Sequence, residues 1–316
     1  MEKVYKTMRN TGAGSIALGV IILVSGLIIG ILRPRHPENT YIMANRLLSL
    51  AAPIMGFKIH IEGEELVKDI KTGIYAGIHQ SNWDIVFQAK CMRKGVVTVG
   101  KKSLLWVPLF GFVYYLAGNI LLDRANARHA VGTIKKVASE IRDRGLSVWM
   151  FPEGHRSLGK GLAPFKTGVV YLAAEAGCPV IPVVSSSYFS NIRLGRWNNG
   201  HIVLRYLDPR VYEQFASNRD AKAAAKALHD EMKSAQDELT KKADELNAAE
   251  GIAPVGTSDK APEEANAAAE AAPEVKDAPQ AQSAAEPSAA ENPSAGKEPS
   301  AGKEPPAGKE PSAGEK

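Results

Sequence analysis

The sequence predicts an α/β fold: a mostly parallel sheet flanked by helices, with an N-terminal membrane-associated helical segment and a disordered C-terminal tail. Three observations predict it. Residues 10–32 carry no ionisable side chain. Between residues 58 and 248, short apolar runs suited to strands alternate with longer segments of helical periodicity. Both patterns are lost after residue 248, so we expect three parts: 1–57, 58–248 and 249–316.

Composition and charge divide near the same place. The whole chain of 316 residues has 39 Lys and Arg against 34 Asp and Glu, but residues 1–250 hold 33 against 22, a net charge of +11. This front part is too apolar for a wholly disordered chain. Two cysteines, Cys91 and Cys178, cannot form a disulfide scaffold or a structural zinc site, and they favour a reducing compartment.

The N-terminal apolar segment is predicted to cross the membrane as an uncleaved helix. Its 23 residues would form a helix of about 34 Å, enough for a hydrocarbon core of about 30 Å. It ends in Leu32-Arg-Pro-Arg35 rather than at a small-residue cleavage site, which argues against a signal peptide. Gly26 and Gly30 either let another helix approach closely or are ordinary membrane-helix glycines. Both flanks are basic, so charge does not settle the orientation.

Two more apolar stretches follow. Tyr41–Phe57 is interrupted by Arg46 and Pro53, which suits an interfacial or re-entrant helix packed on the first segment. Ser103–Leu122 has twenty uncharged residues, and hydropathy taken by itself would make it a membrane span. A proline and two glycines inside it argue against one straight helix.

Residues 58–248 predict strands and helices in alternation. Strands are expected at 58–62, 74–78, 96–99, 146–151, 180–184 and 201–207, and helices at 127–144, 167–176 and 219–248. Such alternation is typical of a mostly parallel sheet with helices on its faces. Pro182 removes one ladder hydrogen bond, so its strand is expected at an edge or end position.

The tail cannot bury a core. Ala295–Ser300 recurs at 301–306 with one change and again at 307–312. A six-residue period rich in Pro, Gly and charge predicts a flexible segment. It is either a solubilising appendage or an adaptor for a partner.

His79 and Asp84 are candidate catalytic residues. His79 follows the strand at 74–78 directly, and Asp84 comes five residues later. On a continuous helix the two side chains would point about 140° apart, but a turn capped by Ser81 or Asn82 would fold Asp84 back. A carboxylate on one imidazole nitrogen fixes the tautomer and makes the other nitrogen a general base. No activated nucleophile accompanies the pair, which suits direct attack by a substrate hydroxyl.

A second group of candidates suits phosphate binding. Phe151–Ser157 follows a strand, and in it Arg156 offers a planar fork that matches a phosphate. Gly154 lets the backbone approach a ligand, and Glu153 could orient Arg156 or a substrate hydroxyl. Standing alone, this segment would be a strand-ending turn with a surface ion pair.

Four motifs in chain order resemble those of the 1-acylglycerol-3-phosphate acyltransferases, or lysophosphatidic acid acyltransferases, of the bacterial type. They are His79-x4-Asp84, Lys101-x2-Leu104-x6-Gly111-x12-Arg124, Phe151-Pro-Glu-Gly-x-Arg-Ser157 and Val180-Ile-Pro-Val183. The resemblance covers about residues 70–190 and therefore says nothing about the tail. One departure is His155, where the family usually has Thr, which puts only a hydroxyl contact in doubt.

The resemblance implies transfer of a fatty acyl group from acyl-CoA or acyl-carrier protein to the sn-2 hydroxyl of lysophosphatidic acid. The product would be phosphatidic acid, in phospholipid biosynthesis. His79 would be the general base and Asp84 would hold it, without a metal, a cofactor or a covalent acyl-enzyme. The resemblance also implies acceptor binding by Lys101, Arg124 and Arg156, with Glu153 and Gly154 shaping the pocket and Pro182 giving structural support.

The basic front part agrees with an anionic lipid substrate, anionic donors and contact with membrane lipids. We expect a protein of the cell inner membrane with its active site on the cytoplasmic side. A span over Ser103–Leu122 would separate Lys101 from Arg124, so this stretch is expected to be an apolar wall or a membrane-dipping surface.

Other functions stay open at this point. The acceptor could be another lysophospholipid or glycerol-3-phosphate, or the chain could be a non-catalytic membrane anchor that presents its tail. No recognised nucleic-acid-binding motif is present, so nucleic acid is not an expected partner.

Overall fold

The sheet has the mostly parallel arrangement that the sequence predicts. The computed structural model describes residues 13–122, 130–189 and 198–252. Seven strands in this part form one sheet of order β1-β7-β6-β2-β5-β3-β4, in which only the β6–β7 pair is antiparallel. They are β1 (Phe57–Glu62), β2 (Ile74–Gly77), β3 (Val96–Lys101), β4 (Ile120–Leu122), β5 (Ser147–Met150), β6 (Val180–Ser185) and β7 (Gly200–Tyr206).

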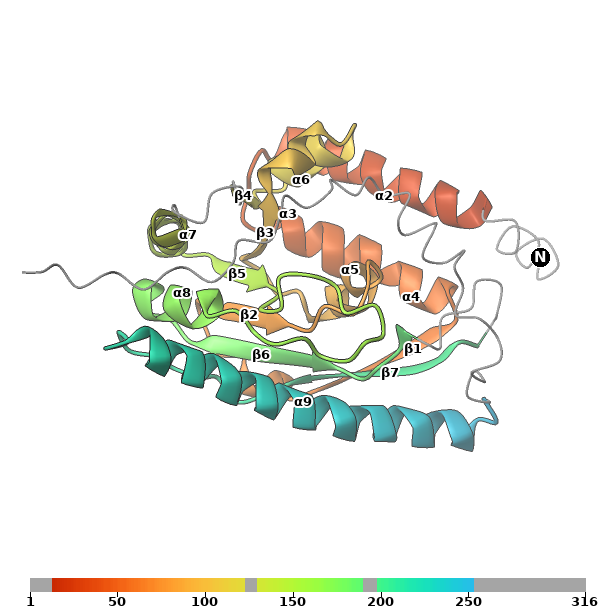
Figure 1. Cartoon of the computed structure of the whole chain (residues 1–316). Helices are drawn as coiled ribbons and strands as arrows, with labels where there is room; N and C mark the ends of the chain where they lie inside the picture. The colour runs from red at the N-terminus through yellow and green to blue at the C-terminus, as the bar shows by residue number, and fades with distance from the viewer. Residues whose placement is uncertain (1–12, 123–129, 190–197, 253–316) are drawn as a thin grey trace, which may run out of the picture. The chain divides into compact units, whose positions relative to one another are not determined.

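Helices cover both faces of the sheet (Figure 1). One face carries α7 (Ala130–Arg144), α8 (Gly168–Ala176) and α9 (Asn218–Ala249). The other carries α3 (Asn39–Tyr41), a π-helical turn (Ile42–Leu47), a 3₁₀ turn (Leu48–Leu50), α4 (Ala51–Ile54), α5 (Asp84–Phe87) and a 3₁₀ turn (Gln88–Cys91). Two more 3₁₀ turns lie at Glu64–Leu66 and Lys102–Trp106.

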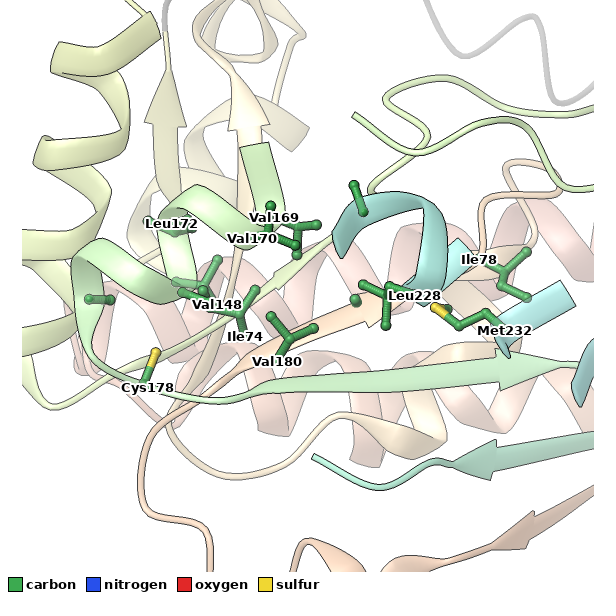
Figure 2. Close-up of a cluster of buried hydrophobic side chains, with 14 of the residues drawn as sticks. Ile74, Ile78, Val148, Val169, Val170, Leu172, Cys178, Val180, Leu228 and Met232 are labelled. Carbon is green, nitrogen blue, oxygen red and sulfur yellow. The ribbon is translucent and has the colours of Figure 1, made fainter. Parts of the chain in front are cut away.

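The core on the α8 and α9 side joins branched side chains of the central strands to the apolar faces of these two helices. Figure 2 shows Ile74, Val148 and Val180 of neighbouring strands next to Leu172 of α8 and Leu228 of α9. Burial of each such side chain contributes about 1.5–3 kcal/mol. Because these strands are covered on both faces, they read in the sequence as short, nearly continuous apolar runs.

The strand that contains Pro182 is not at an edge, so that prediction is wrong. β6 lies between β2 and β7, and Pro182 is paired with Ala76 of β2. Pairing with β7 covers only Val183–Ser185, and Val180 forms an isolated bridge with Arg210, beyond the end of β7. Pro182 therefore lies in a gap of the β7 ladder, where its missing N–H costs no ladder bond, while its carbonyl accepts a 3.0 Å bond from Leu207 N.

The apolar stretch Ser103–Leu122 is not one helix, as its proline and glycines predict. It forms the 3₁₀ turn Lys102–Trp106, then α6 (Phe110–Leu116), then β4. Gly118 has a φ of +88°, a conformation that ends α6 and turns the chain into β4. The sequence analysis missed both α6 and β4, because neither is long enough to show a clear period.

The predicted membrane span corresponds to α2 (Ala13–Leu32). Among the described residues, no helix combines the length and the apolar character needed to cross a membrane, so the structure does not support the predicted span. α2 packs on α6: a Cβ at Gly26 would lie 2.9 Å from Val113 Cγ1, and one at Gly30 would lie 2.7 Å from Leu116 Cβ. These glycines thus permit the close approach of a neighbouring helix.

The second apolar stretch forms an unbroken run of helical turns from Asn39 to Ile54. The run packs on the sheet, where Ala51 and Ala52 are buried beside Phe57, and on α2, where a Cβ at Gly26 would lie 3.5 Å from Met43 Sδ. Its location at a membrane interface stays a prediction.

The chain divides into two compact units, residues 1–279 and 280–316, and every described residue belongs to the first. Helix α9 continues to Ala249. Residues 253–316, most of the predicted tail, lie outside the described part, so the predicted disorder and the three-part division stay predictions.

Candidate active site

Three of the predicted motif segments lie at the carboxyl-terminal ends of neighbouring strands. The strands β2, β5 and β3 are neighbours, with Ala76 paired to Met150 and Thr98 paired to Trp149. His79, the loop 151–157 and Lys101 therefore all lie at the carboxyl ends of adjacent parallel strands. Ligands of open α/β sheets bind outside these ends.

A tight turn after β2 brings His79 and Asp84 together. Asp84 N donates a 3.3 Å bond to Ser81 O, and Trp83 N donates a 3.0 Å bond to Ser81 Oγ. As a result His79 Nδ1 donates to Asp84 Oδ2 over 2.8 Å, so the predicted contact is present. The side chain of His79 is 20% exposed while that of Asp84 is fully buried. This arrangement leaves Nε2 of His79 for a substrate proton.

The buried Asp84 carboxylate is surrounded by hydrogen-bond donors. On Oδ2, Ser81 N joins His79 at 2.9 Å. On Oδ1, the Tyr188 hydroxyl donates over 2.5 Å and Gln88 Nε2 over 2.9 Å. A buried carboxylate needs such partners, because burying a polar group without hydrogen bonds is costly.

Tyr188 and Gln88 were not predicted as site residues. Tyr188 lies 104 residues from Asp84, and no motif marks it. Gln88 follows Asp84 by four residues, and this spacing on a helical turn is a signal that could have found it.

The loop after β5 holds His79 by its ring and by its backbone. The Phe151 ring stacks on the imidazole with 4.0 Å between centroids and 10° between planes. His79 N donates a 2.6 Å bond to Glu153 Oε1, and His79 O accepts a 2.8 Å bond from Ser157 N. The orientation of the imidazole is therefore set by this loop as well as by Asp84.

Glu153 is fully buried, and both of its carboxylate oxygens accept backbone N–H groups. Oε1 takes His79 N, and Oε2 takes Ala163 N at 3.0 Å. Burial raises the pKa of Glu153, and these two bonds oppose the rise. In the structure, Glu153 therefore joins two backbone segments through hydrogen bonds. The resemblance implies a further role for it, in shaping the acceptor pocket.

The cationic candidates lie on the same loop and on β3. Arg156 is half-buried, and its Nη1 donates a 2.7 Å bond to Asn82 Oδ1, which joins the third motif to the first. Lys101 is the last residue of β3. Arg124 lies outside the described residues. Pro182 is paired with Ala76, and Ala76 precedes His79 by three residues.

Gly154 has a φ of +75°, a conformation that favours glycine. A Cβ there would lie 2.8 Å from Lys166 Nζ. The Lys166 ammonium therefore rests against the loop, two residues from Arg156. Lys166 was not among the predicted site residues.

Neither cysteine in this chain is a plausible nucleophile. Both are buried, and burial raises the pKa of the Cys91 thiol to about 12 and that of Cys178 to about 11. Within the described part of the chain, no three His, Cys, Asp or Glu side chains are grouped as metal ligands. His79 and Asp84 are arranged to remove a proton from a hydroxyl. They lie next to the loop 151–157, which is called the cationic loop below because it carries Arg156.

An apolar cavity of about 210 Å³ opens next to this pair. Asp84, Gln88 and Phe151 form its wall on the sheet side, while Ile22 of α2 and Val113 of α6 face them. Gln88 Nε2 donates to Asp84 and to Ile78 O. Its buried Oε1 has no hydrogen-bond partner among the described residues.

Comparison with known proteins places this chain among acyltransferases. Residues 58–186 match a family model described as Acyltransferase. A 1-acyl-sn-glycerol-3-phosphate acyltransferase of Haemophilus influenzae is 43% identical over 190 residues, which are 60% of this chain and 79% of the relative. The protein of the same name from Escherichia coli is 37% identical over 211 residues, 67% of this chain and 86% of the relative.

A solved structure has a similar fold. It is the 1-acyl-sn-glycerophosphate (LPA) acyltransferase PlsC of Thermotoga maritima, with a TM-score of 0.54 and 20% sequence identity. The match covers 78% of this chain and 98% of that chain.

Proposed function

Because this chain belongs to the 1-acyl-sn-glycerol-3-phosphate acyltransferase family, and is therefore an enzyme, we propose that it makes phosphatidic acid. The acyl group moves from acyl-CoA or acyl-carrier protein to the sn-2 hydroxyl of lysophosphatidic acid. The observation that carries this proposal is the His79–Asp84 contact at the sheet edge from which the cationic loop leaves. The identity to relatives of that name supports the choice of substrate.

The proposed mechanism needs one base and no covalent acyl-enzyme. His79 Nε2 removes the proton of the sn-2 hydroxyl as its oxygen attacks the thioester carbonyl carbon. Asp84 accepts Nδ1–H and stabilises the imidazolium. The tetrahedral intermediate then breaks its C–S bond, and the thiolate leaves with the proton from His79. The burial of both cysteines supports direct transfer.

The acceptor phosphate is proposed to bind at the cationic loop. Arg156, Lys101 and, from the resemblance, Arg124 supply the positive charge, and Gly154 and Glu153 shape the backbone around it. The structure adds Lys166, whose ammonium rests against Gly154. A guanidinium presents two parallel N–H groups to a phosphate, so Arg156 is the strongest of these candidates.

The donor acyl chain is proposed to occupy the apolar cavity. Asp84 is part of the cavity lining, together with residues of α2, α6, the sheet and the helical turns at 40–48 and 85–92. The lining is almost entirely apolar, which suits a fatty acyl chain. An acyl chain there would present its thioester carbonyl near His79.

The reaction itself is tested with purified full-length protein. We expect phosphatidic acid from lysophosphatidic acid with labelled acyl-CoA, with acyl-carrier-protein thioester, or with both. Parallel arms offer lysophosphatidylcholine and glycerol-3-phosphate. No product from lysophosphatidic acid with either donor, in protein shown to be folded, would overturn the proposal, and product from another acceptor would replace the substrate.

Replacing Arg156 tests the phosphate site. Arg156→Ala should raise the KM for lysophosphatidic acid about 10- to 100-fold, because a charged hydrogen bond contributes about 1.5–3 kcal/mol. The kcat should change little. The matched control is Arg142→Ala, an exposed arginine of α7 that donates to Glu175 O. An unchanged acceptor KM in Arg156→Ala would contradict the assignment.

Membrane contact is proposed at an apolar surface formed by α2 and the segment 105–115. The exposed apolar side chains there are Val20, Ile21, Val24, Ile28, Ile31, Leu32, Leu105, Trp106, Leu109, Phe110, Phe112 and Tyr115. A contiguous apolar surface of this kind is typical of a lipid or protein contact. It lies on the elements that wall the cavity, so we propose binding to the inner membrane from the cytoplasmic side.

Trp106 is the most exposed of these side chains, at 86%. Trp106→Glu should lower the partition constant for anionic phospholipid vesicles about tenfold, which corresponds to about 1.4 kcal/mol. The measurement is the fraction of protein that sediments with the vesicles. Val211→Glu is the control, since Val211 is 77% exposed but lies outside this surface. Equal sedimentation of the two variants would contradict the proposed membrane surface.

A further inference from the structure

We propose that Tyr188 is a positioning residue of this enzyme: its hydroxyl holds the Asp84 carboxylate so that Asp84 holds His79. This inference rests on the proposed function. Neither the motifs nor the resemblance points to Tyr188. It lies three residues beyond β6 and is fully buried.

The contact between Tyr188 and Asp84 is a strong one by its geometry. The hydroxyl lies 2.5 Å from Asp84 Oδ1, which is the length of a charge-assisted O–H···O⁻ bond. The ring packs edge-on against Phe87 with 4.7 Å between centroids. Burial, and next the charge of Asp84, raise the pKa of Tyr188 well above 10. The phenol therefore stays protonated and remains a donor throughout the range of an enzyme assay.

The two oxygens of Asp84 have different partners, which is why Tyr188 can act on His79. Oδ2 faces His79 and the N–H of Ser81, while Oδ1 faces Tyr188 and Gln88. Rotation of the carboxylate about its Cβ–Cγ bond would take Oδ2 away from His79. The two donors on Oδ1 oppose that rotation.

The loop after β6 is itself tied to the turn after β2. Gln80 Nε2 donates to Ser185 Oγ at 2.8 Å and to Ser186 O at 3.0 Å, and Gln80 Oε1 accepts Tyr188 N at 3.3 Å. Gln80 directly follows His79 in the chain. The end of β6 thus supports the base through Gln80 and Tyr188.

The test is Tyr188→Phe in the full-length enzyme, which removes one hydroxyl and keeps the ring. We expect kcat to fall about tenfold, because a small misplacement of a catalytic group is costly, while both KM values stay within about twofold. The matched control is Tyr206→Phe. Tyr206 is also buried and donates its hydroxyl to Cys91 O at 2.8 Å, on β7 and without contact to Asp84. It should lower thermal stability but keep kcat.

A kcat of Tyr188→Phe equal to wild type would overturn the inference, and so would an equal fall of kcat in Tyr206→Phe. A rise in KM at constant kcat would overturn it in favour of a binding role. Should Tyr188→Phe not fold, Gln88→Met removes the other donor on Oδ1, and an unchanged kcat there would overturn the positioning argument. Wild-type protein without product would instead overturn the proposed function, whereas active wild type beside fully active Tyr188→Phe overturns this inference only.

Discussion

The His79→Ala variant should lose phosphatidic acid formation by about 10²- to 10⁴-fold in kcat, the usual contribution of a general base. Without the imidazole, the sn-2 hydroxyl has no group to take its proton as it attacks the thioester. The bond from the backbone N–H of residue 79 to Glu153 does not need the imidazole, so the variant should fold although it loses the stacking on Phe151. The measurement is the initial rate at saturating lysophosphatidic acid and donor, beside thermal denaturation.

His60→Ala is the matched control for this loss. His60 is also half-buried and bonded to a titratable partner, with its Nε2 2.7 Å from His201 Nδ1. It belongs to β1, at the far edge of the sheet from β3 and β4. A His79→Ala protein that keeps the wild-type rate would eliminate His79 as the base, even with the reaction established.

The Asp84→Asn variant should lose kcat by a factor of about 10³ to 10⁴, the upper value being that of the same change in serine-protease triads. Every group around the Asp84 carboxylate is a donor: His79 Nδ1, Ser81 N, Tyr188 Oη and Gln88 Nε2. An asparagine must turn its own NH₂ toward two of them. If the NH₂ takes the place of Oδ2, His79 must change tautomer, so that Nε2 carries the proton and cannot act as a base. If it takes the place of Oδ1, Tyr188 and Gln88 lose their acceptor.

The double variant separates this explanation from general damage. His79→Ala with Asp84→Asn should be no less active than His79→Ala by itself, since residues that act as a unit are not additive. Asp237→Asn is the control, because Asp237 is an exposed partner of Lys233 on α9. Asp84→Asn activity within tenfold of wild type would remove Asp84 from the mechanism.

The local features of the site were predictable because they depend on neighbours in the chain. Apolar runs of four to six residues that end at His79 or Phe151 are buried parallel strands, and such strands place the residues after them at one edge of the sheet. The turn that folds Asp84 onto His79 needs only Ser81 and short-range hydrogen bonds. These interactions act within a few residues, and so they are visible in the sequence.

Strand order was not predictable in the same way. Pro182 indicated an edge, yet β6 lies between two strands, because an interruption of the β7 ladder removes the need for its N–H. The rule about proline describes only the hydrogen bond that its missing N–H cannot donate. The position of the strand in the sheet depends also on whether the neighbouring strand has an acceptor opposite the proline. That neighbour is β7, the next strand along the chain, and no pattern around Pro182 records where its ladder is interrupted.

The sequence by itself determined the α/β class, the parallel pairing and the pair His79–Asp84, since periodicity, strand ends and turns are short-range properties of the chain. Only the tertiary structure decided that Glu153 holds two backbone N–H groups, that Lys166 rests on Gly154, and that Tyr188 and Gln88 hold Asp84. A buried carboxylate must find its donors wherever the fold brings them, and folding brought Tyr188 from 104 residues away. No spacing rule records such a contact.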